Sequence, residues 1–229
     1  MYFMTRMLSR AYSRIIFFVC IAFFYSAPAY AYVPVLVTQE SLSTISTIED
    51  PTLLQGFYGE LTGFPHTFEI RAEKAFLLRV EVNAPDLPKN TNTLSGIIIK
   101  EQKRGRVEEV TRMEGRGASW EVLEDSLSGA NYRTGTTFEK ELDPGVYRIE
   151  VHTPDNLEKY MLMVGTRDEM EIGYFELLRR LVDVEHFFER SAFWIIESAY
   201  VYIPLLMLLC CLGIGVYVWR MRRLKGGTL

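Results

Sequence analysis

The sequence predicts a mainly β protein: an antiparallel, jelly-roll-like β-sandwich, then an amphipathic juxtamembrane helix, then one C-terminal transmembrane helix. Three observations predict this order. Apolar and polar residues alternate through much of residues 32–166, as in strands with one face on a core. Over residues 167–198 the apolar period becomes helical. Residues 199–219 are then uncharged and long enough to cross about 30 Å of hydrocarbon.

Residues 1–31 have the pattern of a cleavable signal peptide. Arg6, Arg10 and Arg14 precede an uncharged run at residues 15–25, which is shorter than the roughly 20 residues of a spanning helix. Ala29 and Ala31 then supply the small-x-small pattern of a cleavage site, so we expect cleavage after Ala31. The alternative is a lipoprotein signal acylated on Cys20, although bulky residues precede this cysteine.

Charge is segregated along the 229 residues. All 29 acidic residues lie between Glu40 and Glu197, with 18 of the 25 basic ones, so this stretch has a formal charge of −11. An acidic domain argues against nucleic-acid binding, which needs a basic face. None of the 3 cysteines lies in this stretch, which excludes a disulfide or thiolate zinc site there.

Alternation of period two marks the strands of residues 32–166. The clearest runs are Val33–Val37, Phe68–Ile70, Leu78–Val82, Tyr147–Val151 and Tyr160–Val164. The continuous triplet Ile97–Ile99 favours a central strand, and turns rich in Gly, Pro, Asn and Asp separate the runs. Residues 100–135 are polar and charged; we expect a hairpin strand at Val107–Arg112 and a loose insertion there.

Parts of this domain resemble the bacterial pre-peptidase C-terminal domain. The resemblance rests on three segments: Gly59–Leu61 with Phe68–Ile70, Leu78–Val82, and Leu142–Val151 closing with Tyr160–Leu162. In that family, too, a Pro-Gly-x-Tyr strand precedes a closing Tyr-x-Leu strand. The stretches Gly56–Ile70 and Phe138–Gly165 also resemble uncharacterised single-pass bacterial envelope proteins. The resemblance implies a sandwich and no catalytic residue.

A second similarity is to the Golgi-dynamics luminal domain, which shares the plan of signal peptide, sandwich, juxtamembrane helix, span and short tail. This chain departs from that family in lacking its paired cysteines. Its tail, Arg220–Leu229, also lacks the Phe-Phe and dilysine sorting signals. This resemblance implies a secretory cargo adaptor as a minor alternative.

A search for chemistry predicts no catalytic, cofactor-binding or metal-binding residue. His66, His152 and His186 lie too far apart for a histidine metal motif, and His66 is expected in a turn or at a strand edge. Glu121, Glu124 and Asp125 with Trp120 could form a calcium or glycan site, or simply a solvated acidic loop with one anchored tryptophan. The basic run 100–106 could contact anionic lipid or polymer, or could protect a strand edge from pairing.

The amphipathic segment carries apolar residues at alternating spacings of three and four. Tyr174, Leu177, Leu181, Val184 and Phe188 form the stripe, which Ser191 and Ile195 extend. Two arrangements fit the stripe. In the first, the stripe contacts a partner's helix or a second copy of this chain. In the second, the stripe lies on its own sandwich or on the membrane surface. We expect the helix to continue, with at most a small break, into the span.

The span and tail predict topology. The uncharged segment 198–219 is followed by Arg220, Arg222, Arg223 and Lys225, which the positive-inside rule places in the cytoplasm. Together with a signal peptide, this puts residues 32–198 outside the cytoplasmic membrane. Cys210 and Cys211 are either small apolar fillers or, in a eukaryote, acylation sites.

These patterns predict a non-catalytic, membrane-anchored binding or scaffolding protein of the cell envelope. Its partners would be the bilayer, a protein or an envelope polymer, or its own copies, with no nucleic acid and no cofactor. The alternative is an accessory subunit of a membrane complex that recognises its partner through the juxtamembrane and transmembrane helices. A hydrolase would need two converging carboxylates in a cleft, which a sequence does not reveal.

Overall fold

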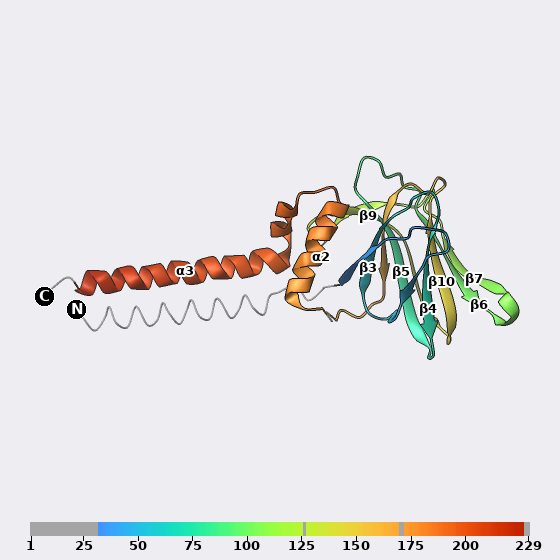
Figure 1. Ribbon diagram of the computed structural model, residues 1–229, viewed down its shortest axis with the longest axis horizontal. Helices are drawn as coiled ribbons and strands as arrows, with labels where there is room; N and C mark the ends of the chain where they lie inside the picture. Colours follow the sequence, from blue (N-terminus) through green and yellow to red (C-terminus); the bar gives the residue numbers. More distant parts are fainter. Residues whose placement is uncertain (1–31, 126, 170–171, 227–229) are drawn as a thin grey trace. The chain divides into compact units, whose positions relative to one another are not determined.

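The computed structural model describes residues 32–125, 127–169 and 172–226 (Figure 1). The chain divides into two compact units at Ile195, a sandwich unit before it and a helical unit from Ile196 onward. Each unit is described by itself. The predicted signal peptide, residues 1–31, lies outside the described residues.

The sandwich consists of two sheets, which confirms the predicted fold class. The six-stranded sheet has, in spatial order, β1 (Val33–Val37), β3 (Gln55–Glu60), β11 (Lys159–Val164), β5 (Phe76–Pro85), β9 (Asn131–Leu142) and β8 (Glu121–Glu124). The five-stranded sheet has β2 (Ile45–Ile48), β4 (His66–Ala72), β10 (Gly145–His152), β6 (Ser95–Glu101) and β7 (Val107–Met113). Most pairs are antiparallel. The pairs β1–β3 and β2–β4, at the sheet edges, are parallel, a direction that alternation alone does not specify.

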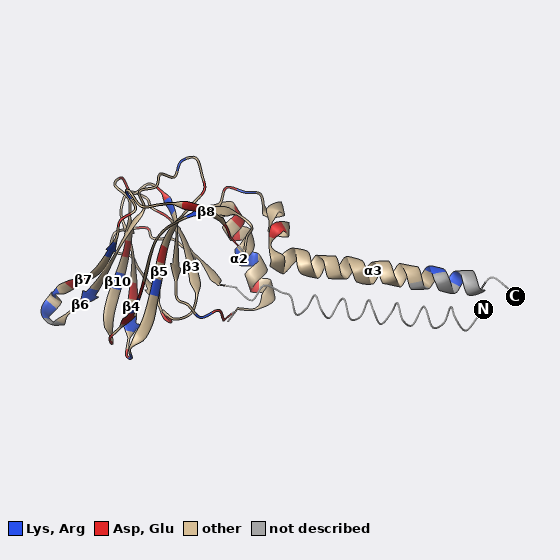
Figure 2. Ribbon diagram, turned by 180° about the vertical axis from the view of Figure 1, so that it is seen from behind, with Lys and Arg blue, Asp and Glu red and all other residues tan. Residues whose placement is uncertain are grey.

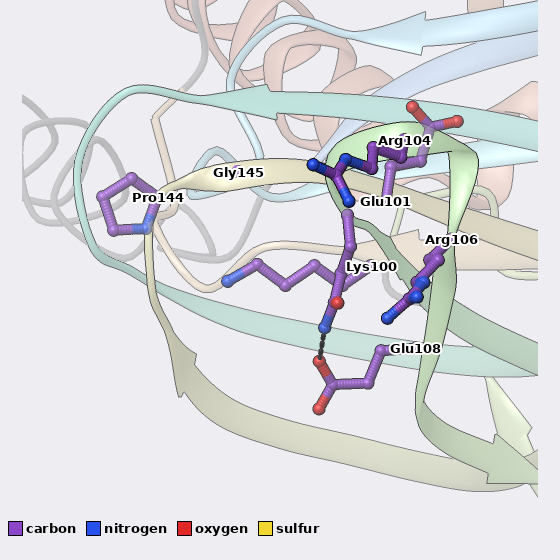
Figure 3. A pocket seen from close by; sticks show the side chains of 8 residues that line it. Lys100, Glu101, Arg104, Arg106, Glu108, Pro144 and Gly145 are labelled. Carbon is purple, nitrogen blue, oxygen red and sulfur yellow. Dashed lines mark hydrogen bonds between the residues drawn. The ribbon is translucent and has the colours of Figure 1, made fainter.

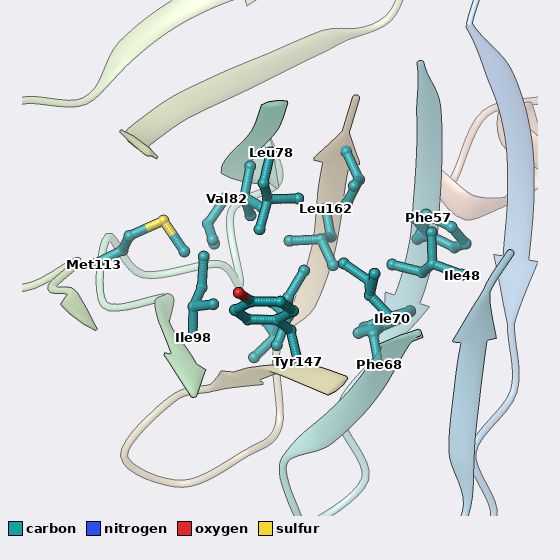
Figure 4. Packing of buried hydrophobic residues seen from close by; sticks show 14 of the residues in the cluster. Ile48, Phe57, Phe68, Ile70, Leu78, Val82, Ile98, Met113, Tyr147 and Leu162 are labelled. Atoms are coloured by element: carbon teal, nitrogen blue, oxygen red, sulfur yellow. The ribbon is translucent and has the colours of Figure 1, made fainter. Parts of the chain in front are cut away.

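The core lies between the two sheets (Figure 4). On β5, Leu78, Val80 and Val82 are all 0% exposed. From the other sheet, Phe68, Ile70 and Ile149 are likewise fully buried. This is the arrangement that period-two sequences require, because successive side chains of a strand point to opposite faces.

A second apolar layer covers part of the outer face of the six-stranded sheet. Helix α2 (Tyr174–Phe187) packs there, beside β1 and β3. The Tyr58 ring of β3 packs edge-on against Phe187, with ring centroids 5.1 Å apart. The Arg180 guanidinium donates to the carbonyl oxygen of Pro34 in β1 over 2.9 Å. The amphipathic segment is therefore part of the sandwich unit.

Helix α2 ends earlier than the sequence spacing predicts. Glu189 takes a left-handed conformation with φ 58°, its N–H donates to the His186 carbonyl, and the Arg190 N–H donates to the Glu185 carbonyl. This pair of bonds is a Schellman cap, which usually has glycine at the left-handed position. Lys159 adds a cation at the helix end, since its ammonium donates to the Phe187 carbonyl (2.9 Å) and pairs with the Glu189 carboxylate (3.2 Å). The predicted helix is therefore interrupted after Phe187 and does not run without a break into the apolar segment.

The remaining helices are a short 3₁₀ helix, η2 (Ala192–Glu197), and the long helix α3 (Ala199–Gly226). Within α3, Ala199–Tyr217 is 19 residues long with a mean hydropathy of 2.2, which is long and apolar enough to cross a membrane. Of the basic residues assigned to topology, Arg220 and Arg223 are exposed on the last turns of α3, and Arg222 and Lys225 lie in the same turns. Figure 2 shows basic residues at this end of α3.

Candidate functional site

The basic run 100–106 forms the turn between β6 and β7. This hairpin lies on the opposite side of the sandwich from α2 (Figures 1 and 2). The turn contains η1 (Lys103–Gly105), and the Gln102 N–H donates to the Arg106 carbonyl over 2.7 Å to close it. Arg104 is left-handed with φ 68°, as is Gly105 with φ 72°. The turn therefore holds Arg104 and Arg106 in a tight reversal of the chain.

An open hollow of about 610 Å³ lies beside this turn. Its cationic lining comprises Lys100 from β6 and Arg104 and Arg106 from the turn (Figure 3). The start of β10 completes the hollow with Pro144 and Gly145, because β10 pairs directly with β6. Segments about forty residues apart in the sequence therefore meet at the hollow.

The two carboxylates of the hollow are already engaged. Glu101 pairs with Arg148 at 2.7 Å, and Glu108 accepts a hydrogen bond of 2.5 Å from the Gln102 side-chain amide. Among the described residues, none of Lys100, Arg104 and Arg106 forms an ion pair. The Gln102 amide leaves the charge of Glu108 in place, so this carboxylate offsets part of the positive charge, and the hollow keeps an excess of cations.

Lys100 is held in place by Tyr147 on the neighbouring strand. Its ammonium lies 5.2 Å from the centroid of the Tyr147 ring, and Tyr147 itself is 1% exposed. A hydrogen bond with the Tyr147 hydroxyl is the main influence that raises the pKa of Lys100. Lys100 is therefore a fixed positive charge at neutral pH. With two arginine forks, which match carboxylate, sulfate and phosphate geometry, the hollow can bind an anionic group.

A second hollow, of about 270 Å³, lies on the outer face of the six-stranded sheet. Arg79, Glu81, Tyr132 and Met163 line it. Glu81 already accepts hydrogen bonds from the Asn83 amide and the Thr134 hydroxyl and lies 3.5 Å from Arg79. Burial raises the pKa of Tyr132 to about 12, so its hydroxyl stays neutral. Glu81 and Arg79 satisfy each other within this hollow, and it is smaller than the first, which makes it the weaker candidate.

The acidic segment 120–125 does not gather its side chains. Trp120 donates its indole N–H to the Gly115 carbonyl over 3.0 Å and packs against the core, while Glu121 and Glu124 are exposed on β8. Asp125 instead is 3% exposed and points inward. No cluster of three metal-ligating side chains occurs in the part of the chain that the structure describes. The described side chains of this segment therefore point to different surroundings instead of converging on one site.

Asp125 belongs to a buried polar cluster that sequence reasoning missed. It accepts hydrogen bonds from the Tyr32 hydroxyl (2.9 Å), the Ser128 hydroxyl (2.6 Å) and the Ser128 N–H (3.0 Å). The Tyr32 hydroxyl also contacts the Tyr58 hydroxyl. Burial raises the pKa of Asp125, and burial and this carboxyl raise the pKa values of both tyrosines. The cluster is buried from solvent, and it links Tyr32, the first described residue, to Tyr58 of β3.

The histidines do not converge. His66 stands at the start of a strand, β4, as expected, but it is 0% exposed and pairs with Val151 of β10, so it is not a turn residue. Its Nδ1 hydrogen-bonds the Tyr160 hydroxyl at 2.8 Å. His152 lies 3.9 Å from Glu150, and His186 is exposed on α2. Each histidine has its own surroundings, with no shared ligand geometry.

The stripe assigned to a partner helix is largely used within the chain. Leu177, Leu181 and Val184 are 0% exposed, and Phe188 is 4% exposed, whereas Tyr174 at the start of α2 is 43% exposed. Of the two arrangements weighed from the sequence, the structure has the stripe on its own sandwich. In α3, Cys210 and Cys211 are exposed free thiols.

Comparisons with known proteins add little. No family model matches the chain. No curated protein matches it. Among solved structures, it is similar to the pre-peptidase C-terminal domain of collagenase from Bacillus anthracis, with 12% identity and a TM-score of 0.35 over 55% of this chain and 98% of that domain. A beta-glucosidase from Paenibacillus barengoltzii is similar at 11% identity and a TM-score of 0.26, over 60% of this chain and 13% of that one. These likenesses carry no functional argument.

Proposed function

We propose that this protein is a non-catalytic, membrane-anchored binding protein whose sandwich lies outside the cytoplasmic membrane and binds an anionic polymer at the β6–β7 hairpin. The observation that carries the proposal is the set of three cations, Lys100, Arg104 and Arg106, that face one hollow without a carboxylate partner among the described residues. The basic residues at the C-terminal end of α3 support the orientation.

The acidic surroundings favour a particular kind of ligand. With a formal charge of −11 between residues 40 and 197, the domain as a whole repels polyanions. At physiological salt this repulsion is screened beyond about 8 Å, so the hairpin tip still attracts an anion locally. A polymer with spaced carboxylate, sulfate or phosphate groups can contact the tip alone. Many weak contacts along a polymer at the membrane surface then add up to avidity.

The alternative is an accessory subunit that recognises its partner through α2 and α3. Four of the five residues of the proposed partner face already pack in the sandwich unit. A partner helix would have to displace α2 from the sheet, which costs the packing of those side chains. We therefore favour the hairpin as the recognition element and keep the helix as the alternative.

The test measures binding of dextran sulfate and of neutral dextran to the full chain in nanodiscs, at about 0.05 and 0.3 M salt. The perturbation is the double charge reversal Arg104→Glu/Arg106→Glu. An exposed charge contact is worth about 1 kcal/mol at 4 Å in water, and reversal turns attraction into repulsion, so we expect at least about a tenfold loss of affinity at low salt.

The matched control is Lys74→Glu/Arg116→Glu, which makes the same change in net charge at exposed positions outside the hollow. It should weaken binding much less, because only long-range repulsion changes. Equal losses in the two double variants, or equal binding of neutral dextran, would overturn the assignment of the hairpin.

A further inference from the structure

Helix α2 has a second face, opposite the one that packs on the sheet. At 100° per residue, Phe175, Arg179, Val182 and His186 share this outer face. Phe175, Arg179 and His186 are exposed and Val182 is half-buried. The outer face thus combines apolar and basic side chains, with one acid, the half-buried Asp183, at its border, whereas the domain as a whole is acidic.

The most exposed aromatic rings of the sandwich unit lie in the same segment. Phe175 is 84% exposed, and Phe193 in η2 is 88% exposed. Trp194, which follows, is 48% exposed and stacks on Arg190, with the guanidinium carbon 5.1 Å from the ring centroid. Isolated exposed apolar residues are ordinary, but aromatic rings flanked by arginines are typical of segments that lie in a lipid interface.

Chain length brings this segment close to the bilayer. The apolar helix begins at Ala199, six residues after Phe193. A 3₁₀ helix rises about 2.0 Å per residue, so the 6 residues of η2 span about 12 Å. The headgroup region on each side of a bilayer is roughly 5–7 Å thick. If α3 spans the membrane, η2 therefore reaches the headgroups, and α2 lies one short connection away.

We propose that the outer face of α2, together with Phe193 and Trp194, is a lipid-docking surface that holds the sandwich against the membrane in which α3 is inserted. Helix α2 is then packed on both sides, by its own sheet on one face and by lipid headgroups on the other. Phe175 and Phe193 insert between headgroups, while Arg179 pairs with anionic lipid. The hairpin, on the opposite side of the sandwich, points away from this surface and stays free for a ligand.

The experiment uses the full chain with Cys20, Cys210 and Cys211 replaced by alanine, one copy per nanodisc of phosphatidylcholine with phosphatidylglycerol. A nitroxide label on His186→Cys reports on the outer face of α2 without removing Phe175 or Arg179. Collision rates with oxygen, which enters lipid, are compared with those of a water-soluble nickel chelate. The matched control carries the label on Thr47→Cys, exposed on β2 of the other sheet.

We expect the ratio of oxygen to nickel collisions at position 186 to exceed that at position 47 by at least about threefold. The change Phe175→Ser/Phe193→Ser should bring position 186 down to the ratio of the control, with an unchanged thermal melting curve since both rings are exposed. Equal ratios at positions 186 and 47 in the parent protein would overturn the proposal. So would protection that appears only at high protein density in vesicles, because a second copy would then cover the face.

Discussion

Truncating Leu181 to alanine measures how firmly α2 is held on the sandwich. The side chain is 0% exposed and lies between helix and sheet. Leu181→Ala removes three carbons, each worth about 0.8 kcal/mol of burial, or about 2.4 kcal/mol together. A partly collapsed cavity adds to this, so we expect a loss of about 3 kcal/mol. The matched control is Leu157→Ala, at a leucine that is 65% exposed, which should change stability by less than about 0.5 kcal/mol.

The assay must separate global unfolding from release of the helix alone. If α2 opens locally, the loss in a urea titration is limited to the free energy that docks the helix. Hydrogen exchange at the amides of Tyr174–Phe187 reports the docking directly. A loss of about 3 kcal/mol corresponds to exchange faster by on the order of a hundredfold.

One result would refute this reasoning. If Leu181→Ala leaves both the urea midpoint and the exchange of α2 unchanged, the stripe does not hold the helix on the sheet. If the same variant then loses a co-purifying membrane protein, the alternative of an accessory subunit takes precedence. Retention of such a partner together with fast exchange would place recognition elsewhere on the chain.

Three further predictions concern buried groups and one glycine. Burial raises the pKa of Asp125, so above about pH 4 the folded state binds more protons than the unfolded state. The free energy of unfolding therefore falls as pH rises through this range. Asp125→Asn should remove this pH dependence from urea titrations. The pKa of His66 is lowered by burial, so stability is lost as pH falls below about 6.5, and His66→Gln should reduce that loss in the same titrations. Gly165 has φ 97°, and a Cβ there would overlap the Leu53 carbonyl oxygen, so Gly165→Ala should cost about 2–4 kcal/mol in thermal melts. Gly105→Ala, with φ 72° in open space, should cost only about 1 kcal/mol, and equal costs would contradict the steric reasoning.

Strands with one buried face were predictable because their own side chains alternate. The runs around Val80 and Ile149 occupy β5 and β10 as expected. Strand β9, Asn131–Leu142, was not predictable in the same way, since half of its residues are Thr, Glu and Lys and few are apolar. It is a strand because β5 pairs with it along its length. The backbone hydrogen bonds with β5 thus stabilise a strand that the apolar pattern of residues 131–142 does not predict.

The candidate site was predictable only in part. The basic run was visible as a composition, but the hollow was not, because Pro144 and Gly145 come from the opening of another strand. The burial of Asp125 was hidden for a similar reason. Its partner Tyr32 lies 93 residues earlier, and an acidic residue in a polar segment ordinarily stays in water.

The spacing of α2 shows what a helical stripe does and does not specify. Spacings of three and four identify the buried face, and Leu177, Leu181 and Val184 are indeed buried. Such a stripe does not distinguish a partner helix from a sheet of the same chain, since both are apolar surfaces. Nor does the stripe mark the end of the helix. The left-handed position after a helix is usually occupied by glycine, but here it is occupied by Glu189. That early end has a functional consequence: it separates the docked helix from the apolar helix and places the exposed rings of η2 between them. The proposed lipid contact rests on these exposed rings and on the outer face of α2.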